Sequence, residues 1–315
     1  MNAVPLRRLG KTELQVPVVA FGAGPVSGLM TGDDHTLQLA VVQRALQNRI
    51  HWFDTAAGYG QGASESNLGR CLSALPNANM IHVATKVRVL FTDPRTLQQQ
   101  IFDGIHQSLE RLRRKSVTLL QVHNGITKQR NDEPFSVAAE DVAAASEITE
   151  ALIELKKRRL ASFIGLTGTG CPTSLRTVIR SGVFDTLQIP YNLLNPSAGQ
   201  EMDDDRGDRN YGSVLADCLQ MDMGAFAIRV FAGGALLGRS PSAHTLKTPF
   251  FPLELYRQDV IKSDALRQEY GVNKLTQRAI QFALQHTAVH SAIIGFGTSQ
   301  EVDAGVKATA GLTWP

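Results

Sequence analysis

Four ionisable side chains stand at or just past the ends of apolar, strand-like segments: Asp54, Tyr59, Lys86 and His123. They offer a carboxylate, a phenol, an ammonium and an imidazole. When parallel strands close into a barrel, their carboxyl ends meet on one face, and that face carries the active site. The spacing therefore predicts a single site that contains all four groups.

The chemistry of this set centres on the phenol of Tyr59. A free tyrosine has a pKa near 10, and a neighbouring ammonium such as that of Lys86 would favour the phenolate and lower this pKa. Asp54 would keep Lys86 charged and oriented, and a neutral His123 could donate a hydrogen bond to a substrate carbonyl. The set suits carbonyl reduction, in which hydride reaches carbon while Tyr59 protonates oxygen. In reverse it suits the oxidation of an alcohol or a lactol.

Bulk composition excludes several classes of protein. The chain has 315 residues, of which 43% are hydrophobic and 19% charged, which fits a well-cored soluble α/β protein. Its net charge of +3 is too small for the concentrated basic face of a nucleic-acid binder. The N-terminus has no apolar leader, and no run of about 18 apolar residues occurs. We expect a cytoplasmic protein without nucleic-acid or membrane partners.

The cysteines predict neither disulfides nor a metal site. Cys71, Cys171 and Cys218 are scattered, odd in number and without metal-ligand spacing. Reduced, buried thiols are the expected state in a cytoplasmic protein.

Strand-like and helix-like segments alternate along the whole chain. A helical face is clearest where Leu97, Ile101, Ile105 and Leu109 repeat every four residues. The strand-like runs lie near 17–22, 50–54, 80–87, 117–123, 161–166, 186–190, 224–231 and 291–295. Eight strands alternating with helices predict a (β/α)₈ TIM barrel, and we expect residues 1–315 to form that single domain.

The barrel should carry additions at both ends. Residues 5–16 precede the first strand and could form a β-hairpin that closes the bottom. Long loops are expected at 124–146, 196–212 and 232–262, after the fourth, sixth and seventh strands. They would overhang the catalytic face and shape the choice of substrate.

The segments around the four ionisable residues resemble signatures of the aldo-keto reductase superfamily. The segment FDTAAGYG (53–60) is similar to its Asp-and-Tyr segment, and ATK (84–86) and LLQVH (119–123) to its Lys and His strands. Further matches follow in the family's order: SE at 64–65, LG at 68–69, GLTG at 165–168, LQIPYN at 187–192 and IIG at 293–295.

This resemblance covers about residues 5–310 and implies a (β/α)₈ barrel with Tyr59 as general acid and base. It also implies a nicotinamide cofactor, extended across the carboxyl ends of the strands. The segments 192–199 and 228–238 are most similar to aldose dehydrogenase-type members. The implied substrate is a small carbonyl compound or a sugar.

The resemblance also implies where the cofactor would lie. Gln188 would hold the nicotinamide carboxamide, helped by Thr167, while Gly168 stands where the family has Asn and offers no amide. Many relatives have a stacking aromatic side chain where this chain has Ile228. The remaining implied contacts are Gly22 and Ala23 at the ribose, Arg229, Phe231 and Gly233 at the pyrophosphate, and Gly295, Phe296, Thr298 and Glu301 at the adenosine end.

Two of these assignments leave alternatives open. A glycine-rich backbone can cradle a pyrophosphate, but Arg229 could pair with that phosphate or with a loop carboxylate. NADP-preferring relatives place Lys or Arg where this chain has Glu301, and a carboxylate would repel a 2′-phosphate. NAD is therefore favoured over NADP, although Arg239 and Lys247 lie in a loop that could reach the site.

Three other interpretations compete with a carbonyl-reducing enzyme. A Rossmann fingerprint at 22–27 fails because Ser27 stands where Gly or Ala is needed and no acidic residue follows about 20 residues on. A lyase or isomerase using Lys86 as a Schiff base would make the position of Tyr59 accidental. A non-catalytic, nicotinamide-binding regulatory or partner subunit would share the fold, but the four intact groups favour an enzyme. The sequence does not predict the oligomeric state.

Overall fold

A closed barrel of parallel strands forms the centre of the molecule in the computed structural model, which describes residues 3–76, 80–202 and 209–312. Around the barrel the strands follow one another in chain order, as right-handed crossovers require. They are β3 (Val19–Gly22), β4 (Trp52–Asp54), β5 (His82–Val87), β6 (Val117–Val122), β9 (Ala161–Thr167), β10 (Thr186–Pro190), β11 (Gly224–Ile228) and β12 (Val289–Ile294). The predicted (β/α)₈ barrel is confirmed.

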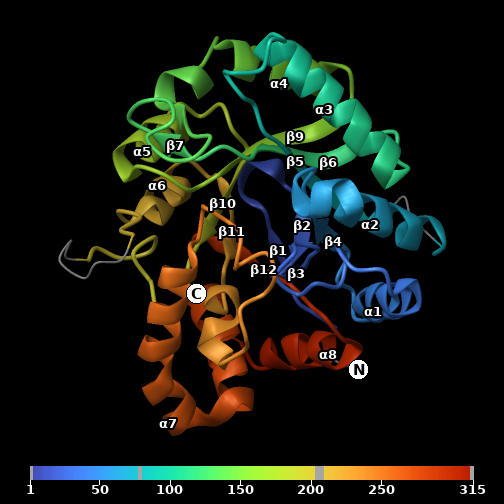
Figure 1. Cartoon of the computed structure of the whole chain (residues 1–315), viewed down its shortest axis with the longest axis vertical. Helices are drawn as coiled ribbons and strands as arrows, with labels where there is room; N and C mark the ends of the chain where they lie inside the picture. Colours follow the sequence, from blue (N-terminus) through green and yellow to red (C-terminus); the bar gives the residue numbers. More distant parts are fainter. Residues whose placement is uncertain (1–2, 77–79, 203–208, 313–315) are drawn as a thin grey trace.

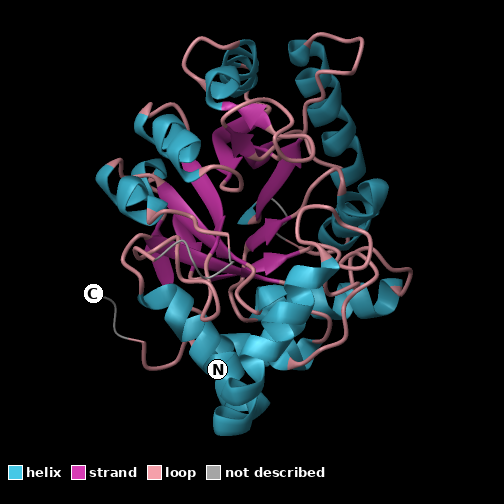
Figure 2. Cartoon of the chain, turned by 60° about the vertical axis from the view of Figure 1, so that its left-hand side comes forward, coloured by secondary structure: helices cyan, strands magenta, loops and turns pink. Residues whose placement is uncertain are grey.

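A helix follows each barrel strand, and these helices surround the barrel (Figures 1 and 2). They are α1 (His35–Gln47), α2 (Ala63–Ser73), α3 (Leu97–Leu112), α4 (Glu147–Lys157), α5 (Pro172–Arg180), α6 (Val214–Gln220), α7 (Leu253–Gln285) and α8 (Ser299–Ala308). The α7 helix breaks at Gly271, where φ is 66° and ψ is 158°. Glycine reaches this backbone conformation without the clash that a Cβ would cause.

An N-terminal hairpin closes the amino end of the barrel, as expected from residues 5–16. Its strands β1 (Leu6–Arg8) and β2 (Gln15–Pro17) are antiparallel. Between them Leu9 is fully buried, and a Cβ on Gly224, the first residue of β11, would lie 2.7 Å from its side chain. The cluster inside the barrel consists of Leu9, Val16, Ala20, Trp52, Ala84, Leu119, Phe226 and Ile293.

The long segments on the carboxyl face are more structured than the sequence predicts. The first contains the short strands β7 (Ile126–Thr127) and β8 (Val137–Ala138). The predicted loop 232–262 is partly wrong, because it begins with the 3₁₀ helix η6 (Ala232–Leu237) and its end belongs to α7. Residues 203–208 of the segment 196–212 lie outside the described part of the chain.

The predicted strand 224–231 is three residues too long. It ends at Ile228 because Arg229 has a left-handed backbone with φ of 56°, which turns the chain out of the sheet. The side chains that follow therefore lie on the rim of the barrel.

No helix in the described residues combines the length and apolarity needed to cross a membrane. The same residues contain no group of three or more His, Cys, Asp or Glu side chains able to hold a metal ion.

Replacing Leu9 with Ala should lower the free energy of unfolding by about 2–5 kcal/mol, because it leaves a cavity where a fully buried side chain packs at the amino end of the barrel. Denaturant unfolding measures this loss. Leu6→Ala in the same hairpin is the matched control, since Leu6 is 45% exposed and should cost less than about 0.5 kcal/mol. Equal stabilities for the two variants would show that the hairpin does not seal the barrel.

Candidate active site

Lys86 occupies the centre of the predicted four-residue site. Its Nζ donates to Asp54 Oδ1 at 2.5 Å, to the carbonyl of Thr55 at 2.8 Å and to Tyr59 Oη at 3.3 Å. The ammonium thus uses all three of its donors. Only 1% of the Lys86 side chain and 5% of the Asp54 side chain are exposed. Burial lowers the pKa of Lys86, but the Asp54 carboxylate and Tyr59 together outweigh it, so the pKa lies above its ordinary value.

The second oxygen of Asp54 accepts hydrogen bonds from two amides. One comes from Gln188 Nε2 on β10, and the other from Gln121 Nε2 on β6 at 3.3 Å. The role of Gln121 was not predicted, although the sequence holds a signal. Gln121 and His123 are two residues apart, so an extended strand turns both side chains to the same face.

Tyr59 comes from a loop that has an unusual backbone. Gly60, Gln61 and Gly62 all have positive φ, and a Cβ on Gly60 would lie 2.9 Å from the Thr31 side chain. The Tyr59 ring meets the His123 ring edge-on, with centroids 5.6 Å apart. The loop therefore brings the phenol against both Lys86 and His123.

Buried hydrogen bonds hold the base of this loop. Thr55 Oγ1 and Ser64 Oγ lie 2.8 Å apart, and Ser64 Oγ donates to the Ala23 carbonyl at 2.7 Å. The start of α2 is thus tied to the ends of β3 and β4.

His123 follows the last residue of β6, and its backbone N–H donates to the Val87 carbonyl at 2.8 Å. Burial lowers the pKa of its imidazole well below the usual range. The charges of Lys86 and Arg88, together with His244, lower it further. His123 is therefore neutral at physiological pH and can act as a hydrogen-bond donor or acceptor.

The geometry brings all four predicted groups together at the carboxyl ends of β4, β5 and β6. A model of the aldo/keto reductase family matches residues 19–312, which is most of the chain. The chain belongs to the aldo/keto reductase family. As a member of it, the protein is an oxidoreductase that acts on carbonyl compounds.

Curated relatives of this aldo/keto reductase include sugar dehydrogenases. L-galactose dehydrogenase of Arabidopsis thaliana is 28% identical over 322 residues, covering 99% of this chain and 90% of the relative. D-threo-aldose 1-dehydrogenase of a Pseudomonas species is 26% identical over 309 residues, covering 90% of this chain and 86% of the relative. The holo form of aldo-keto reductase AKR11C1 from Bacillus halodurans has the same fold, with a TM-score of 0.70 and 20% identity over 99% of this chain and 93% of that one.

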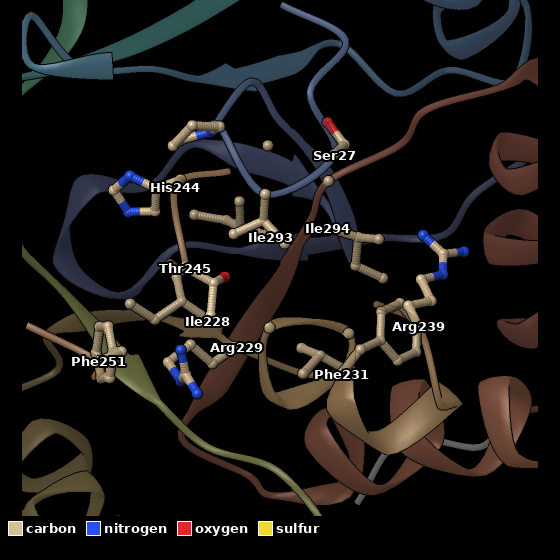
Figure 3. Close-up of a pocket in the computed structure, with 18 of the residues that line it drawn as sticks. Ser27, Ile228, Arg229, Phe231, Arg239, His244, Thr245, Phe251, Ile293 and Ile294 are labelled. Carbon is tan, nitrogen blue, oxygen red and sulfur yellow. The ribbon is translucent and has the colours of Figure 1, made fainter. Parts of the chain in front are cut away.

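An extended cleft runs from the reductase's four-residue site to α8. Its first part, about 250 Å³, contains Tyr59, Asp54 and Gln188 in its lining. Figure 3 shows His244 and Phe251 on one side of this part and Arg239 and Phe231 on the other. A second cavity, also about 250 Å³, shares Phe231, Leu237, Arg239, Ile294 and Gly295 with the first and reaches Glu301.

This cleft fits a dinucleotide lying extended across the barrel mouth. Gly22 lines the inner end, where a Cβ would lie 3.0 Å from the Ile293 side chain, so β3 packs closely against β12 there. Gly233 and Gly234 have φ of 71° and 103°, so their backbone turns in a way that favours glycine, and both line the cleft. Thr167 Oγ1 is buried without a hydrogen-bond partner in the described residues.

Of the other predicted cofactor residues, two line this cleft and two have structural contacts nearby. Gly295 lines both cavities, and Phe296 lines the second. Ala23 is buried, with its N–H donating to the Asp54 carbonyl at 2.8 Å. Thr298 caps α8, where its hydroxyl accepts from the N–H of Glu301 at 3.2 Å.

Two charged cofactor candidates already have protein partners. Arg229 lies 3.5 Å from Asp259 of α7 and over the ring of Phe251, at 4.0 Å. Of the two alternatives left open by the sequence, phosphate or a loop carboxylate, Arg229 here has a carboxylate partner, which belongs to the helix α7 and not to a loop. Glu301 accepts from Arg239, which lies 62 residues before it, and from the N–H of Gly297 at 2.6 Å.

Replacing His123 with Gln should make stability less sensitive to acid. Because folding depresses the pKa of His123, the unfolded chain binds this proton first as pH falls below about 6.5. Wild type therefore loses stability relative to the variant below that pH, with a limiting slope of about 1.4 kcal/mol per pH unit. Urea unfolding between pH 7 and pH 5 measures the difference, and parallel curves would contradict a depressed pKa.

Proposed function

We propose that this protein is a nicotinamide-dependent oxidoreductase that interconverts the carbonyl of an aldehyde, ketone or aldose with an alcohol or lactone. Tyr59 is its general acid and base. The observation that carries this proposal is the 3.3 Å contact between Lys86 Nζ and Tyr59 Oη, with Lys86 itself held by Asp54. A phenol in contact with a buried ammonium is a proton donor whose anion is stabilised in place.

The residues divide the reaction between them. In reduction, Tyr59 donates its proton to the carbonyl oxygen, and Lys86 stabilises the resulting phenolate. The neutral imidazole of His123 positions the same oxygen by a hydrogen bond. In oxidation, the Tyr59 phenolate accepts the hydroxyl proton. Asp54 keeps Lys86 charged and in reach of the phenol throughout.

A nicotinamide nucleotide, when bound, would supply or accept the hydride at the carbon. Gly22 and Gln188 would hold its nicotinamide end, since both line the cleft beside Tyr59. Gly233 lines the middle of the cleft, and Glu301 lies at the far end. At that far end Glu301 would repel a 2′-phosphate to the extent that its pairing with Arg239 leaves its charge uncompensated, so NAD is the favoured nucleotide.

The curated relatives support an aldose as the substrate class. Two of them are named as dehydrogenases of L-galactose and of D-threo-aldoses, and each matches nearly the whole chain. A purely regulatory, nicotinamide-binding role would leave the Lys86–Asp54 pair and its contact with Tyr59 without a purpose.

Tyr59→Phe should lower kcat by roughly 10²- to 10⁴-fold while leaving nucleotide affinity nearly unchanged, because only the proton donor is lost. Steady-state rates with aldoses and aldehydes, and fluorescence titrations with NADH and NADPH, measure both quantities. Tyr270→Phe on α7 is the control and should keep the wild-type rate. A Tyr59→Phe enzyme with a near-normal rate would refute the role of Tyr59 as the acid. If neither NADH nor NADPH binds to the wild type, the proposed nicotinamide dependence is refuted.

Glu301→Lys should shift the nucleotide preference toward NADP by at least about tenfold, equivalent to about 1.4 kcal/mol. The change removes a repelling carboxylate and adds a cation that can pair with a 2′-phosphate. The ratio of dissociation constants for NADH and NADPH measures it. Glu254→Lys, the same charge change at an exposed position of α7, is the control. An unchanged ratio for Glu301→Lys would show that the 2′-position does not lie at this residue.

A further inference from the structure

Arg88 lies directly after β5, two residues past Lys86 of the four-residue site. Residues two apart on an extended strand face the same side, and Ala84 belongs to the cluster inside the barrel while Lys86 reaches Asp54. Arg88 is the next residue in this series and follows β5 directly. It therefore stands at the barrel mouth, on the same side as Lys86.

The guanidinium of Arg88 is held by aromatic rings and has no anionic partner among the described residues. Its carbon lies 5.3 Å from the ring centroid of Phe135 and 4.7 Å from that of Phe250. Its Nε is buried without an acceptor. Burial lowers the pKa of Arg88, although an arginine stays charged at any physiological pH. Arg88 as a whole is half-buried, and a partly desolvated cation without a counter-charge costs free energy that an anionic ligand would offset.

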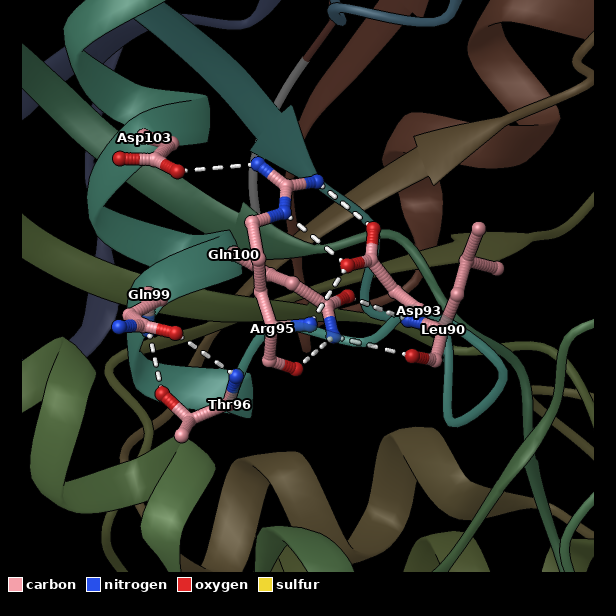
Figure 4. Close-up of polar contacts among 7 residues, drawn as sticks. All are labelled: Leu90, Asp93, Arg95, Thr96, Gln99, Gln100 and Asp103. Atoms are coloured by element: carbon pink, nitrogen blue, oxygen red, sulfur yellow. Dashed lines mark hydrogen bonds and ion pairs between the residues drawn. The ribbon is translucent and has the colours of Figure 1, made fainter.

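The other charged side chains around Arg88 have ionic partners of their own, so none of them is available to pair with its guanidinium. A cavity of about 210 Å³ is lined by Lys86, Arg88, Asp93, Arg95 and His123, among others. Figure 4 shows that Arg95 pairs with Asp93 and Asp103, at 2.7 and 2.9 Å. Lys86 pairs with Asp54, and His123 is neutral. Arg88 is the one charged group of this lining that lacks an ionic partner in the described residues.

The wall that carries Asp93 and Arg95 is fixed onto α3. Gln100 Oε1 accepts from the N–H of Leu90 at 2.8 Å, and its Nε2 donates to the carbonyls of Leu90 and Arg95 (Figure 4). The chain just past Arg88 is thereby tied down. The backbone that follows Arg88 is therefore held in place by α3.

We propose that Arg88 binds a carboxylate of the substrate, so that the preferred substrates are carbonyl acids or aldoses bearing a carboxylate, as in uronic acids. Aromatic rings over a guanidinium leave its N–H groups, which lie in its plane, free to grip a carboxylate in a bidentate manner. Lys86 and His123 line the same cavity as Arg88, and Tyr59, which lines the adjoining cleft, contacts both of them. A substrate that spans this junction can place its carbonyl by Tyr59 and His123 and its carboxylate on Arg88. This inference rests on the proposed oxidoreductase function.

The test compares a matched pair of aldehydes, 4-carboxybenzaldehyde and benzaldehyde, and a pair of aldoses, galacturonate and galactose. Wild type should have the higher kcat/KM for the acid in at least one pair. Arg88→Met should lower the acid-to-neutral ratio of kcat/KM by roughly 10- to 100-fold, mainly through KM, because a charge-assisted contact is lost. Arg88→Lys keeps the charge without the fork and should give an intermediate ratio.

Arg158→Met is the control variant. Arg158 also lies over a phenylalanine, 4.8 Å from the ring of Phe102, but it pairs with Glu154 at the far end of α4. Its substitution should leave the acid-to-neutral ratio unchanged. Turnover by wild type without a preference for the acid in either pair, or a preference that survives Arg88→Met, would overturn the proposal.

A binding experiment separates this proposal from the proposed function. Calorimetric titration of the full chain with benzoate and with benzyl alcohol needs no turnover. Tighter binding of benzoate that disappears in Arg88→Met supports the anion site even if no nicotinamide-dependent rate is found, in which case the proposed function alone fails. Equal binding of benzoate by wild type and Arg88→Met overturns the anion site whatever the rates.

Discussion

The buried ion pair between Lys86 and Asp54 is the constraint on which the rest of the site depends. Two charges almost without solvent contact are tolerated only when their remaining donors and acceptors are also satisfied. Here the ammonium turns its other hydrogens to a loop carbonyl and to Tyr59, and the carboxylate receives amides from Gln121 and Gln188. Because these groups come from β4, β5, β6 and β10, the pair fixes several strand ends to one another. Removing one partner of such a pair typically costs about 3–5 kcal/mol.

The same constraint explains how a single loop residue, Tyr59, is brought into contact with a fixed ammonium, as the proposed proton donor requires. Strand register places Gly22, Asp54 and Ala84 side by side, and Lys86 beside Gln121. The barrel thus presents a fixed ammonium, and the left-handed turn after Tyr59 needs only to bring one phenol to it. A shift of the loop would weaken the contact between Tyr59 and Lys86, but the ammonium of Lys86 would stay in place because Asp54 and the Thr55 carbonyl hold it. Rigid strands hold the electrostatics, and in the proposed reaction the loop supplies the proton.

Local pattern in the sequence was enough to predict the barrel, its hairpin and the four ionisable groups. Alternating apolar runs define strands, and parallel closure brings their ends together without knowledge of any contact. Long-range pairing could not be predicted in this way. The contact of Gln188 with Asp54 joins residues 134 apart, and that of Arg239 with Glu301 joins residues 62 apart. The end of β11 is set by the positive φ of Arg229, and the sequence does not predict this backbone conformation because Arg229 is not a glycine.

The pairing of Arg239 with Glu301 changes how nucleotide discrimination should be understood. On its own, a carboxylate at the end of the cleft would repel a 2′-phosphate. With Arg239 beside it, part of that charge is neutralised, and the guanidinium is itself a phosphate ligand. The side chains are 48% and 29% exposed, so the pair is worth only about 0–1 kcal/mol and can open at little cost. If Glu301 discriminates against NADP as proposed, the strength of that discrimination depends on how firmly Glu301 stays paired with Arg239, and a protein that retains this pair need not exclude either nucleotide completely.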